Sequence, residues 1–390
     1  MKKYNFDEQI ERRGTDCVKY DRLPFFGNAN AIPLWVADTD FRVADFIMEA
    51  LHQRMEHEIL AYSNRSANYY PSIVNWLEKR HGWTVDRNMI TSSPGVVSAV
   101  TTLILALSHP GDKVVVQPPV YFPFFSCVKD TGRQLVENPL VLKEGRYYFD
   151  FDDLKQKLDS KTKLLILCNP HNPGGMVWRR EELEELGNIC LANGTVIISD
   201  EIHSDLVFKG NQHLPLPTVS DELAQNCAVC MAPNKTFNIA GLASAFLVIP
   251  NKELKKRYDH WLHAIHISDG NIFGNIALEA AYTDGSDWVD QLMAYLTENR
   301  RFLETFIRER LPKVKMLVPE ATFLAWLDLS AYGMTESKIA EILVHEAGVV
   351  MNKGSMFGSG GEGYFRLNFG CPKATLQKAL EKMEEALIKY

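Results

Sequence analysis

A single lysine, Lys235, stands in an apolar stretch of the chain. It follows the run CAVCM and precedes TFNIAGLASAFLVIP, and no other formally charged residue lies between Gln225 and Pro250. Surroundings of low polarity disfavour the charged ammonium form and lower the pKa of a lysine, which makes its amine a candidate nucleophile. A lysine that extends its ammonium group to solvent along an apolar surface would give the same pattern. Both interpretations stay open from this segment alone.

Functional side chains follow four apolar runs that are predicted to be buried strands. The runs span residues 113–119, 164–170, 195–201 and 227–233, and their lack of polar alternation suits strands that are covered on both faces. In an open α/β sheet, ligands bind at the carboxyl ends of the strands. Each residue there fits an ordinary turn or cap by itself, but we expect the set to converge at one edge of the sheet. The set comprises Tyr121, Asn169, Asn172, Asp200, Ile202, His203, Asn234 and Lys235.

The segment TSSPGVVSAVTTLILAL has the signals of a helix start. Ser93, Pro94 and Gly95 precede a long apolar run, and proline is favoured in the first helical turn. The free backbone N–H groups of Gly95, Val96 and Val97 would suit a phosphate group. Most helix N-termini bind no ligand, so this motif indicates a phosphate site only together with the other residues.

Together these positions describe one ligand. Its phosphate would lie on the helix start, its aromatic ring would stack on Tyr121, and a cationic ring nitrogen would pair with Asp200. Asn172 would donate to a phenolate oxygen, and the amine of Lys235 would form an imine. Pyridoxal 5'-phosphate has these features, and its sites use a lysine Schiff base with an acidic partner for the pyridinium nitrogen. We therefore predict pyridoxal phosphate as the cofactor.

The elements that position these residues alternate between short strands and longer helices. A further apolar run at 244–250 and a helical stretch at 179–194, closed by Asn-Gly, continue the pattern. Repeated β-then-α order predicts an α/β fold with a mostly parallel sheet and helices on both faces. From about Trp288, a long helix followed by strands and helices indicates a smaller α+β unit. We expect three parts: an N-terminal segment over 1–43 that packs with the small domain, a large cofactor-binding domain over 44–287, and a small C-terminal domain over 288–390.

Composition and charge narrow the functional classes. The 390 residues are 46% apolar, which suffices for a sizeable core, and the net charge is −7 with no basic tail. A net negative charge without a basic tail does not indicate a nucleic-acid-binding surface. No apolar run approaches the ~18 residues of a membrane span, and the first 26 residues lack the apolar region of a secretory signal. The sequence therefore predicts a cytoplasmic protein that binds neither nucleic acid nor a membrane.

Two patterns of metal-ligating residue types lack the context of a metal site. Cys227 and Cys230 form a C-x-x-C, but within a strand their side chains would point to opposite faces. The odd total of seven cysteines indicates reduced core thiols. His260, His263 and His266 have helical spacing without a carboxylate in register, so we expect exposed histidines. We predict no metal.

The motifs, taken in chain order, resemble those of the fold-type I pyridoxal-phosphate enzymes, the aspartate-aminotransferase-like superfamily. The matching pieces span nearly the whole chain: SSPGVV, PPVYFPF, NPHNPGG, SDEIHSDL, NKTFNIAGL and FRLNFGCP. PLWVADTDF (Pro33–Phe41) and the segment Ala61–Trp83 make the sequence similar to the MalY/PatB branch, of the cystathionine β-lyase or cysteine-S-conjugate β-lyase type. The resemblance implies the α,β-elimination of a small sulfur-containing amino acid to pyruvate, ammonia and a thiol.

The resemblance also implies a role for each matching residue. Lys235 would hold the cofactor and then act as the base on the substrate Cα–H, while Asp200 would keep the pyridine nitrogen protonated. Asn172 would bond the phenolic oxygen, and Tyr121 would stack on the ring. Arg366 would bind the substrate α-carboxylate through its two-pronged guanidinium group. The remaining cofactor contacts would come from Gly95, Val96, Val97, Asn169, Ile202, His203 and Asn234, and Ala37, Tyr121 and Asn172 would complete the substrate site.

The resemblance implies a homodimer with shared active sites, because Tyr62 would reach the cofactor phosphate of the neighbouring subunit. Many superfamily members carry a serine and an arginine on the phosphate where this chain has Ala232 and Ala243. The phosphate would then depend more on backbone amides and on Tyr62. Histidine at position 203, where aminotransferases commonly carry tyrosine, is typical of the lyase branch.

Two alternatives stay open. An aminotransferase on the same scaffold begins with the same removal of the Cα proton, but it protonates the cofactor carbon instead of expelling a β-thiolate. A regulatory protein that keeps the fold without turnover belongs to a different class. The complete set of Lys235, Asp200 and Arg366 argues against that class, and we predict a β-lyase.

Overall fold

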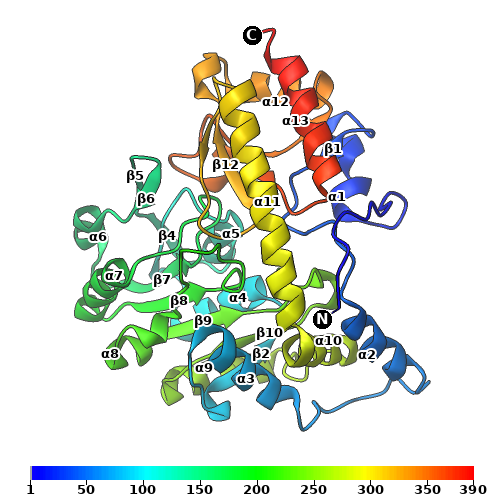
Figure 1. Ribbon diagram of the computed structural model, residues 1–390. Coiled ribbons are helices and arrows are strands. Elements are labelled where there is room, and N and C mark those ends of the chain that lie inside the picture. Colours follow the sequence, from blue (N-terminus) through cyan, green and yellow to red (C-terminus); the bar gives the residue numbers. More distant parts are fainter. Residues whose placement is uncertain (1) are drawn as a thin grey trace.

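A seven-stranded mixed sheet forms the centre of the larger part of the molecule (Figure 1) in the computed structural model, which describes residues 2–390. Neighbouring strands are parallel, except where β10 pairs with β2 and with β9. This confirms the predicted, mostly parallel sheet. In spatial order the strands are β2 (Ile90–Ser93), β10 (Ala245–Val248), β9 (Cys227–Met231), β8 (Val196–Asp200), β7 (Thr162–Cys168), β3 (Lys113–Val116) and β4 (Gln134–Glu137).

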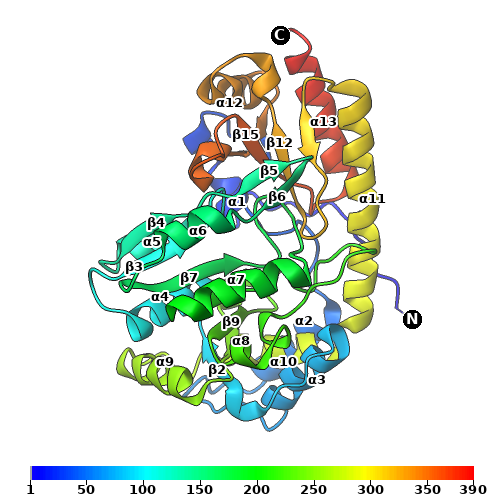
Figure 2. The same ribbon diagram turned by 90° about the vertical axis from the view of Figure 1, so that its left-hand side faces the viewer.

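Helices cover both faces of this sheet (Figure 2). One face packs against α4 (Val96–Leu107), α5 (Pro123–Lys129) and α9 (Lys252–Ala264). The opposite face packs against α6 (Phe151–Lys157), α7 (Arg180–Asn193) and α8 (Asp221–Ala224). Beside β2 and β10, α10 (Ile272–Asp284) packs against both α2 (Asp45–Met55) and α3 (Tyr69–His81).

The central strands bury apolar side chains on both faces. In β7, Leu164 and Ile166 face α4 while Leu165 and Leu167 face α7. Burial on both sides explains why these strands read as continuous apolar runs in the sequence. Cys227 and Cys230 of β9 follow the same alternation, because they belong to the cores on opposite faces of the sheet. The predicted divergence of the two thiols is therefore confirmed.

A four-stranded sheet forms the centre of the smaller part, and its neighbouring strands are all antiparallel. Helix α11 (Ser286–Arg310) runs along the side of both parts (Figures 1 and 2), and α12 (Glu336–His345) and α13 (Lys373–Leu387) lie beside the small sheet. Its strands in spatial order are β11 (Lys315–Leu317), β12 (Leu324–Asp328), β15 (Tyr364–Asn368) and β14 (Asn352–Lys353).

The N-terminal segment contacts this smaller part through a short parallel pair, in which β1 (Ile32–Pro33) lies beside β13 (Val349–Val350). Between α1 (Val18–Asp21) and α2, no strand or helix is longer than four residues. This part of the chain crosses from the small sheet to the large one. A hairpin of β5 (Val141–Lys143) and β6 (Arg146–Tyr148) extends from the large part.

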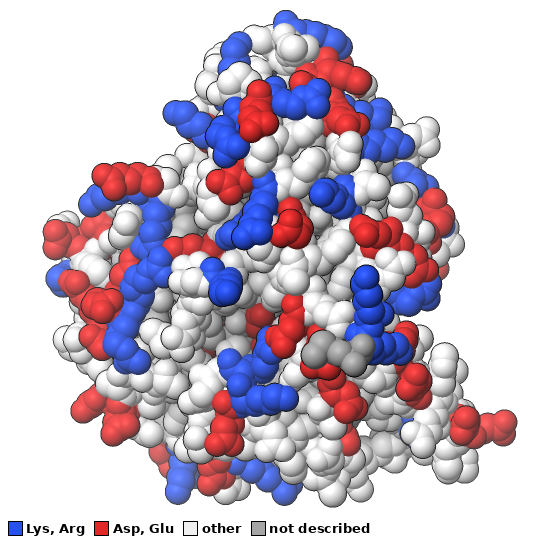
Figure 3. All heavy atoms as spheres, viewed as in Figure 1, with Lys and Arg blue, Asp and Glu red and all other residues white. Residues whose placement is uncertain are grey.

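The surface shows no segregation of charge on the face seen in Figure 3, where basic and acidic side chains are interspersed. Within residues 2–390, no helix is both long and apolar enough to cross a membrane. His260, His263 and His266 are exposed, as expected. In the same part of the chain, no group of three or more potential metal-ligating side chains is placed to hold a metal ion.

Candidate active site

A cavity of about 170 Å³ lies at the carboxyl ends of β7 and β8. Asp200 is the last residue of β8, and it is paired in register with Cys168 of β7 and Cys230 of β9. The strand ends therefore bring the predicted residues to one sheet edge. The lining comprises Ala37, Gly95, Val96, Val97, Ser98, Tyr121, Cys168, Asn172, Asp200, Ile202, His203, Asn234, Lys235 and Ala240.

Lys235 lies in the turn after β9, and its side chain enters the cavity. Its Nζ donates a hydrogen bond to the backbone carbonyl of Ala37 at 2.6 Å. Burial, together with the nearby Arg366 charge, lowers the pKa of this amine to about 8, although Asp38 and Asp200 act in the opposite direction. The amine is thus held at a ligand cavity, and it is neutral over a wider range of pH than a surface lysine.

Asp200 is almost fully buried, and its Oδ1 accepts a hydrogen bond from the Ile202 amide at 3.1 Å. Burial raises the pKa of this carboxyl to about 7, and the Ile202 hydrogen bond and the Lys235 charge partly offset the rise. A cationic ring nitrogen placed against Asp200 would favour the ionised carboxylate. The side chain therefore suits a pyridinium partner.

Arg366 extends from β15 and is buried. Its Nη1 donates to Asn172 Oδ1 at 3.1 Å, and its Nη2 donates to the Trp35 carbonyl at 2.9 Å and to Asn352 Oδ1 at 2.7 Å. Its Nε has no partner in the described chain, and burial lowers the pKa of the guanidinium group to about 10. Across residues 2–390, no carboxylate lies within salt-bridge distance of it. A buried cation of this kind requires a counter-charge, which a substrate carboxylate would supply.

The first turn of α4 forms the opposite end of the cavity. Gly95 precedes the helix in an extended conformation, and a Cβ added to Gly95 would meet no atom within 4 Å. The first N–H groups of a helix have no partner inside the helix, so those of Val96 and Val97 are available to an anion. Lys235 is the one basic side chain among the residues that line the cavity, apart from the neutral His203. At this end, the main-chain N–H groups and Ser98 are therefore the groups that are available to an anion.

Two cavity side chains carry buried polar atoms without partners in the described chain: His203 Nδ1 and Asn234 Oδ1. Burial lowers the pKa of His203 to about 3, so its ring is neutral at physiological pH. Buried polar groups normally have hydrogen-bond partners. The orphaned atoms, the free helix start and the acid–amine pair fit a polar cofactor with a phosphate and a ring nitrogen, as pyridoxal phosphate is.

Tyr121 lies on the wall of the cavity after β3. Its ring centroid is 5.6 Å from that of Phe124 in an edge-to-face arrangement. Burial raises the pKa of its hydroxyl to about 12, so the phenol stays neutral. A neutral aromatic ring on the wall is suited to stacking on a ligand ring.

A sequence model of the class I and II aminotransferases matches residues 31–383. The chain belongs to this family. It is 44% identical to the cystathionine β-lyase PatB of Bacillus subtilis (strain 168), over 98% of this chain and 100% of that protein.

Solved structures of relatives superpose closely on the chain. One is a pyridoxal-phosphate-bound protein of Clostridium difficile 630 that carries an aminotransferase name, with 42% identity, a TM-score of 0.97, and 99% and 100% of the two chains covered. Another is the pyridoxal-phosphate-bound C–S lyase of Staphylococcus hominis, with 34% identity, a TM-score of 0.92, and 99% and 98% coverage.

These relationships confirm several expectations from the sequence: the fold-type I architecture, the MalY/PatB resemblance, pyridoxal phosphate as the cofactor, and a C–S lyase as the enzyme class. The aminotransferase family is named after transaminases, but the chain's curated relatives above 40% identity include a β-lyase. The roles of individual residues remain predictions.

Three predicted residues do not line the cavity of a single chain. Asn169 is fully buried behind it, where its Nδ2 donates to the Leu214 carbonyl at 3.2 Å. Arg366 reaches the cavity wall through its hydrogen bond to Asn172. Tyr62 is fully exposed at the surface. Arg366 therefore lies directly behind a residue of the cavity wall, Asn169 follows the lining residue Cys168 in the chain, and Tyr62 is not among the residues that line the cavity of its own chain.

Sequence reasoning missed Ser98, Cys168 and Ala240, which line the cavity. Two of them had a detectable signal, because Ser98 lies one residue beyond the predicted helix start and Cys168 lies near the end of the predicted strand 164–170. The Cys168 thiol also lies 3.3 Å from the Asn172 amide, which bonds to it. Nothing in the sequence marks Ala240.

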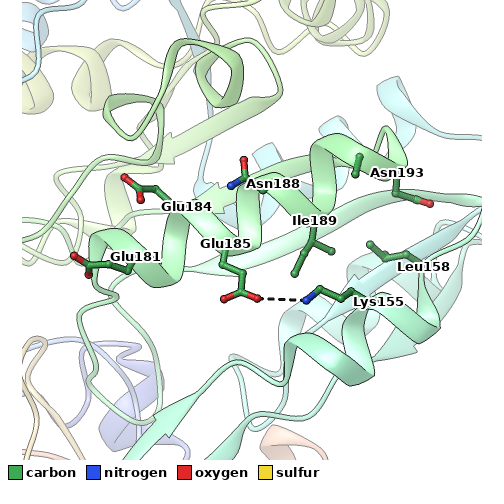
Figure 4. A pocket seen from close by; sticks show the side chains of 9 residues that line it. Lys155, Leu158, Glu181, Glu184, Glu185, Asn188, Ile189 and Asn193 are labelled. Carbon is green, nitrogen blue, oxygen red and sulfur yellow. Dashed lines mark hydrogen bonds and ion pairs between the residues drawn. The ribbon is translucent and has the colours of Figure 1, made fainter.

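A larger hollow of about 740 Å³ lies between α6 and α7, and Figure 4 shows its side chains. Its polar residues are mainly Glu181, Glu184 and Glu185 along the outer face of α7, and Lys155 of α6 lies 3.4 Å from Glu185. These side chains are solvent-exposed and form ordinary surface ion pairs. The smaller cavity, with its buried acid, amine and arginine, is the candidate active site.

Proposed function

We propose that this protein is a pyridoxal-phosphate-dependent β-lyase that cleaves the carbon–sulfur bond of L-cystathionine or a related cysteine S-conjugate. The products are pyruvate, ammonia and a thiol. The observation that carries the proposal is the meeting of Lys235, Asp200 and Asn172 around one cavity, with Arg366 behind it and without a carboxylate. The 44% identity to a cystathionine β-lyase supports this choice of substrate class.

Each part of the cavity has a separate task in this proposal. The first turn of α4 binds the phosphate, Asp200 faces the ring nitrogen, and Tyr121 covers one face of the ring. Asn172 accepts from Arg366 through its Oδ1, so its Nδ2 is the end that can donate to the phenolic oxygen. Lys235 would hold the cofactor covalently until the amino group of the substrate takes its place and releases the lysine amine. When bound, pyridoxal phosphate supplies an electron sink for the substrate Cα.

Lys235 also moves the proton in the proposed reaction. Its pKa of about 8 leaves a useful fraction of neutral amine near neutral pH, and a general base is most effective when its pKa lies near the working pH. The amine takes the substrate Cα proton. Loss of the β-thiolate then follows, and the ammonium form of Lys235 is a nearby proton source for a leaving group.

Arg366 orients the substrate. Its position behind Asn172 and its lack of a carboxylate partner suit a two-pronged contact with an α-carboxylate, which a lysine could not reproduce. This contact would fix the Cα–H bond with respect to Lys235. Ala37 completes the substrate wall beside Lys235.

The direct test is product stoichiometry with the purified holoenzyme. L-cystathionine, L-cysteine and L-djenkolate should each be assayed for pyruvate, ammonia and thiol. Equal release of pyruvate and ammonia, without an added keto acid, is the expected result for at least one of them. An amino group that moves to an added keto acid, with no ammonia, would instead establish the aminotransferase alternative that the C. difficile relative's name keeps open.

We also propose a homodimer with shared active sites. The support is the fully exposed Tyr62, which is predicted to reach the phosphate of the neighbouring subunit, together with exposed apolar side chains close to it in sequence: Met55, Ile59 and Leu60. Grouped exposed apolar side chains are typical of association surfaces. A second subunit would add a side chain at the end of the cavity that has few of its own.

Mixing two inactive variants tests the shared site. Tyr62→Ala and Lys235→Ala should each lack activity, and exchange of subunits should restore part of it, because one of the two sites in a mixed dimer then carries neither change. Subunit exchange must be verified independently, for example with differently tagged chains. If exchange occurs and activity does not return, Tyr62 and Lys235 serve the same chain's site and the shared-site proposal is wrong.

Two further expectations stay proposals. We propose a cytoplasmic location, which is supported by seven free cysteines, six of them buried, because thiols persist in a reducing compartment. We also propose the division into residues 1–43, 44–287 and 288–390. The pairing of β1 with β13 supports the attachment of the first segment to the third.

A further inference from the structure

The residues Trp35–Phe41 form an extended segment that we call the strap, and it contacts two of the charged groups of the site. The Ala37 carbonyl accepts from Lys235 Nζ at 2.6 Å, and the Trp35 carbonyl accepts from Arg366 Nη2 at 2.9 Å. No strand or helix lies within the strap. Besides the backbone bond from the Asp40 amide to the Gly370 carbonyl at 2.9 Å, several side chains from other segments reach the backbone of the strap.

On the side of the small sheet, the strap is held by buried polar groups. Asn368 Nδ2 donates to the carbonyls of Val36 and Asp38, both at 2.6 Å. The fully buried Lys19 lies 2.8 Å from Asp40 Oδ2 and 3.4 Å from Asp38 Oδ1. A buried ion pair of this kind is costly to disturb once formed. These contacts attach the strap to the small sheet and to the N-terminal segment.

On the side of the large sheet, the Asn238 amide joins the strap to the loop that carries Lys235, in addition to the bond from Lys235 itself to Ala37. Asn238 follows Lys235 by three residues. Its Oδ1 accepts from the Thr39 amide at 3.2 Å, and its Nδ2 donates to the Phe41 carbonyl at 2.9 Å. The Asn238 side chain thus uses both its acceptor and its donor on backbone groups of the strap that lie two residues apart.

The backbone of Asn238 has a φ of 58°, in the left-handed region. Glycine, asparagine and aspartate adopt this conformation more readily than other residues. Asparagine is the residue of these three that combines the conformation with both a donor and an acceptor. The local conformation and the double hydrogen bond therefore account together for this residue type.

We propose that Asn238 is a positioning residue for Lys235. It sets the spacing between the strap and the lysine loop, so that the Ala37 carbonyl lies at Lys235 Nζ and covers it. A buried ammonium group needs an acceptor, and this carbonyl is the acceptor whenever the amine is free and carries a proton. The inference rests on the proposed role of Lys235 as a base, and it adds the means by which that base is held in place.

The test uses two variants that tolerate the left-handed backbone. Asn238→Gly removes both hydrogen bonds, and Asn238→Asp keeps the acceptor while losing the donor. Glu144→Gly is the matched control, because Glu144 has a φ of 49° in the exposed β5–β6 turn far from the site in sequence. Circular dichroism and gel filtration would establish that each variant is folded.

The first measurement is trace acetylation of Lys235 in the full-length apoprotein at pH 9.5, read by mass spectrometry and normalised to the unfolded chain. At this pH the amine is largely neutral, so the rate reports how well Lys235 is covered. We expect labelling to rise about tenfold in Asn238→Gly, as expected for the loss of two hydrogen bonds, and to rise less in Asn238→Asp. Glu144→Gly should label like the wild type.

The second measurement is the kinetics of the holoenzyme. We expect kcat of Asn238→Gly to fall about tenfold with KM within about threefold, the pattern of an interaction needed in the transition state but not for binding. Unchanged labelling, or unchanged kcat, in both Asn238 variants would overturn the proposal. If the wild type itself eliminates no thiol, the proposed function fails, while the labelling still decides whether Asn238 positions Lys235.

Discussion

The amine end of the candidate site consists of charged side chains, namely Lys235 and Asp200 on the cavity wall and Arg366 behind Asn172, whereas the first turn of α4, where we propose that the phosphate binds, consists of main chain and small residues. At the amine end, Lys235 and Asp200 come from the large sheet and Arg366 comes from the small sheet. Lys235 and Arg366 each donate a hydrogen bond to a distant segment, and Asp200 accepts one from the neighbouring turn. At the phosphate end, the first turn of α4 offers N–H groups, and the residues of this helix start that line the cavity are Gly95, Val96, Val97 and Ser98.

The difference follows from what each end must do. Acid–base chemistry requires pKa values set by burial and by neighbouring charge, and here burial moves the pKa of Lys235 down to about 8 and that of Asp200 up to about 7. A phosphate requires only donors with the correct geometry. We therefore expect the amine end to depend on a few side chains, and the phosphate end to distribute its contacts over the backbone.

Asp200→Asn should give the largest effect, because it removes the charge from the amine end. An asparagine cannot stabilise a protonated ring nitrogen, and the loss of one preorganised electrostatic contact typically costs ~3–4 kcal/mol of transition-state stabilisation. We expect turnover to fall by two to three orders of magnitude while the cofactor stays bound, measured by steady-state kinetics and by the visible absorbance. Near-normal turnover would refute the role of Asp200.

The stability of the apoprotein should carry a pH signature from the same carboxyl. Its pKa is raised from 3.8 to about 7 in the folded state, so the folded protein binds the proton more tightly than the unfolded chain does. The stability that this provides is fully present below pH 3.8 and is lost as the pH rises through about 7, by a few kcal/mol at most.

Urea unfolding at fixed protein concentration, between pH 4 and 8, measures this signature. Relative to the wild type, Asp200→Asn should show a weaker fall in stability over that range, because the amide does not ionise. An identical pH dependence of the two proteins would show that Asp200 ionises in the folded apoprotein as it does in water.

Arg366→Lys should affect binding more than chemistry. It keeps the charge but loses the two-pronged contact with a carboxylate, and a hydrogen bond to a charged group contributes ~1.5–3 kcal/mol. We expect KM to rise by one to two orders of magnitude with an unchanged cofactor spectrum. A normal KM would mean that another group binds the α-carboxylate.

Gly95→Ala should give the smallest effect, and it examines the phosphate end. A Cβ at this position would meet no atom of the chain within 4 Å, and the extended backbone suits any residue. We expect the stability of the apoprotein to stay within ~0.5 kcal/mol and cofactor affinity to fall by less than the ~1.4 kcal/mol of a tenfold change. Equilibrium dialysis and urea unfolding would measure both. A complete loss of cofactor would show that this end is as intolerant as the amine end.

The sequence predicted the strands that bury apolar side chains on both faces of the sheet. Strands β7, β8, β9 and β10 are apolar on both faces and were recognisable as runs. Strand β2, with the sequence ITSS, is as buried but polar, and its serines are satisfied by tertiary contacts such as the hydrogen bond from Arg65 to Ser92. A pattern of polarity cannot reveal a strand of that kind.

The candidate site was predictable where it depends on strand ends, as for Asp200, Asn172 and Lys235. The contacts made by the strap were not predictable, because Lys235 and its acceptor Ala37 are 198 residues apart in the sequence, and Asn238 and its acceptor Phe41 are 197 residues apart. Arg366 and Ala37 entered the prediction through resemblance to a family and not through their local sequence. Long-range placement is the part that requires the structure.

The central claim is that Lys235 carries the cofactor, and reduction with borohydride tests it most directly. The purified holoenzyme is reduced, digested and analysed by mass spectrometry for the peptide that bears the added cofactor. We predict that the peptide containing Lys235 is labelled, and that a Lys235→Ala variant treated in the same way shows no labelled peptide. Attachment of the cofactor to a different lysine in the wild type would contradict the account.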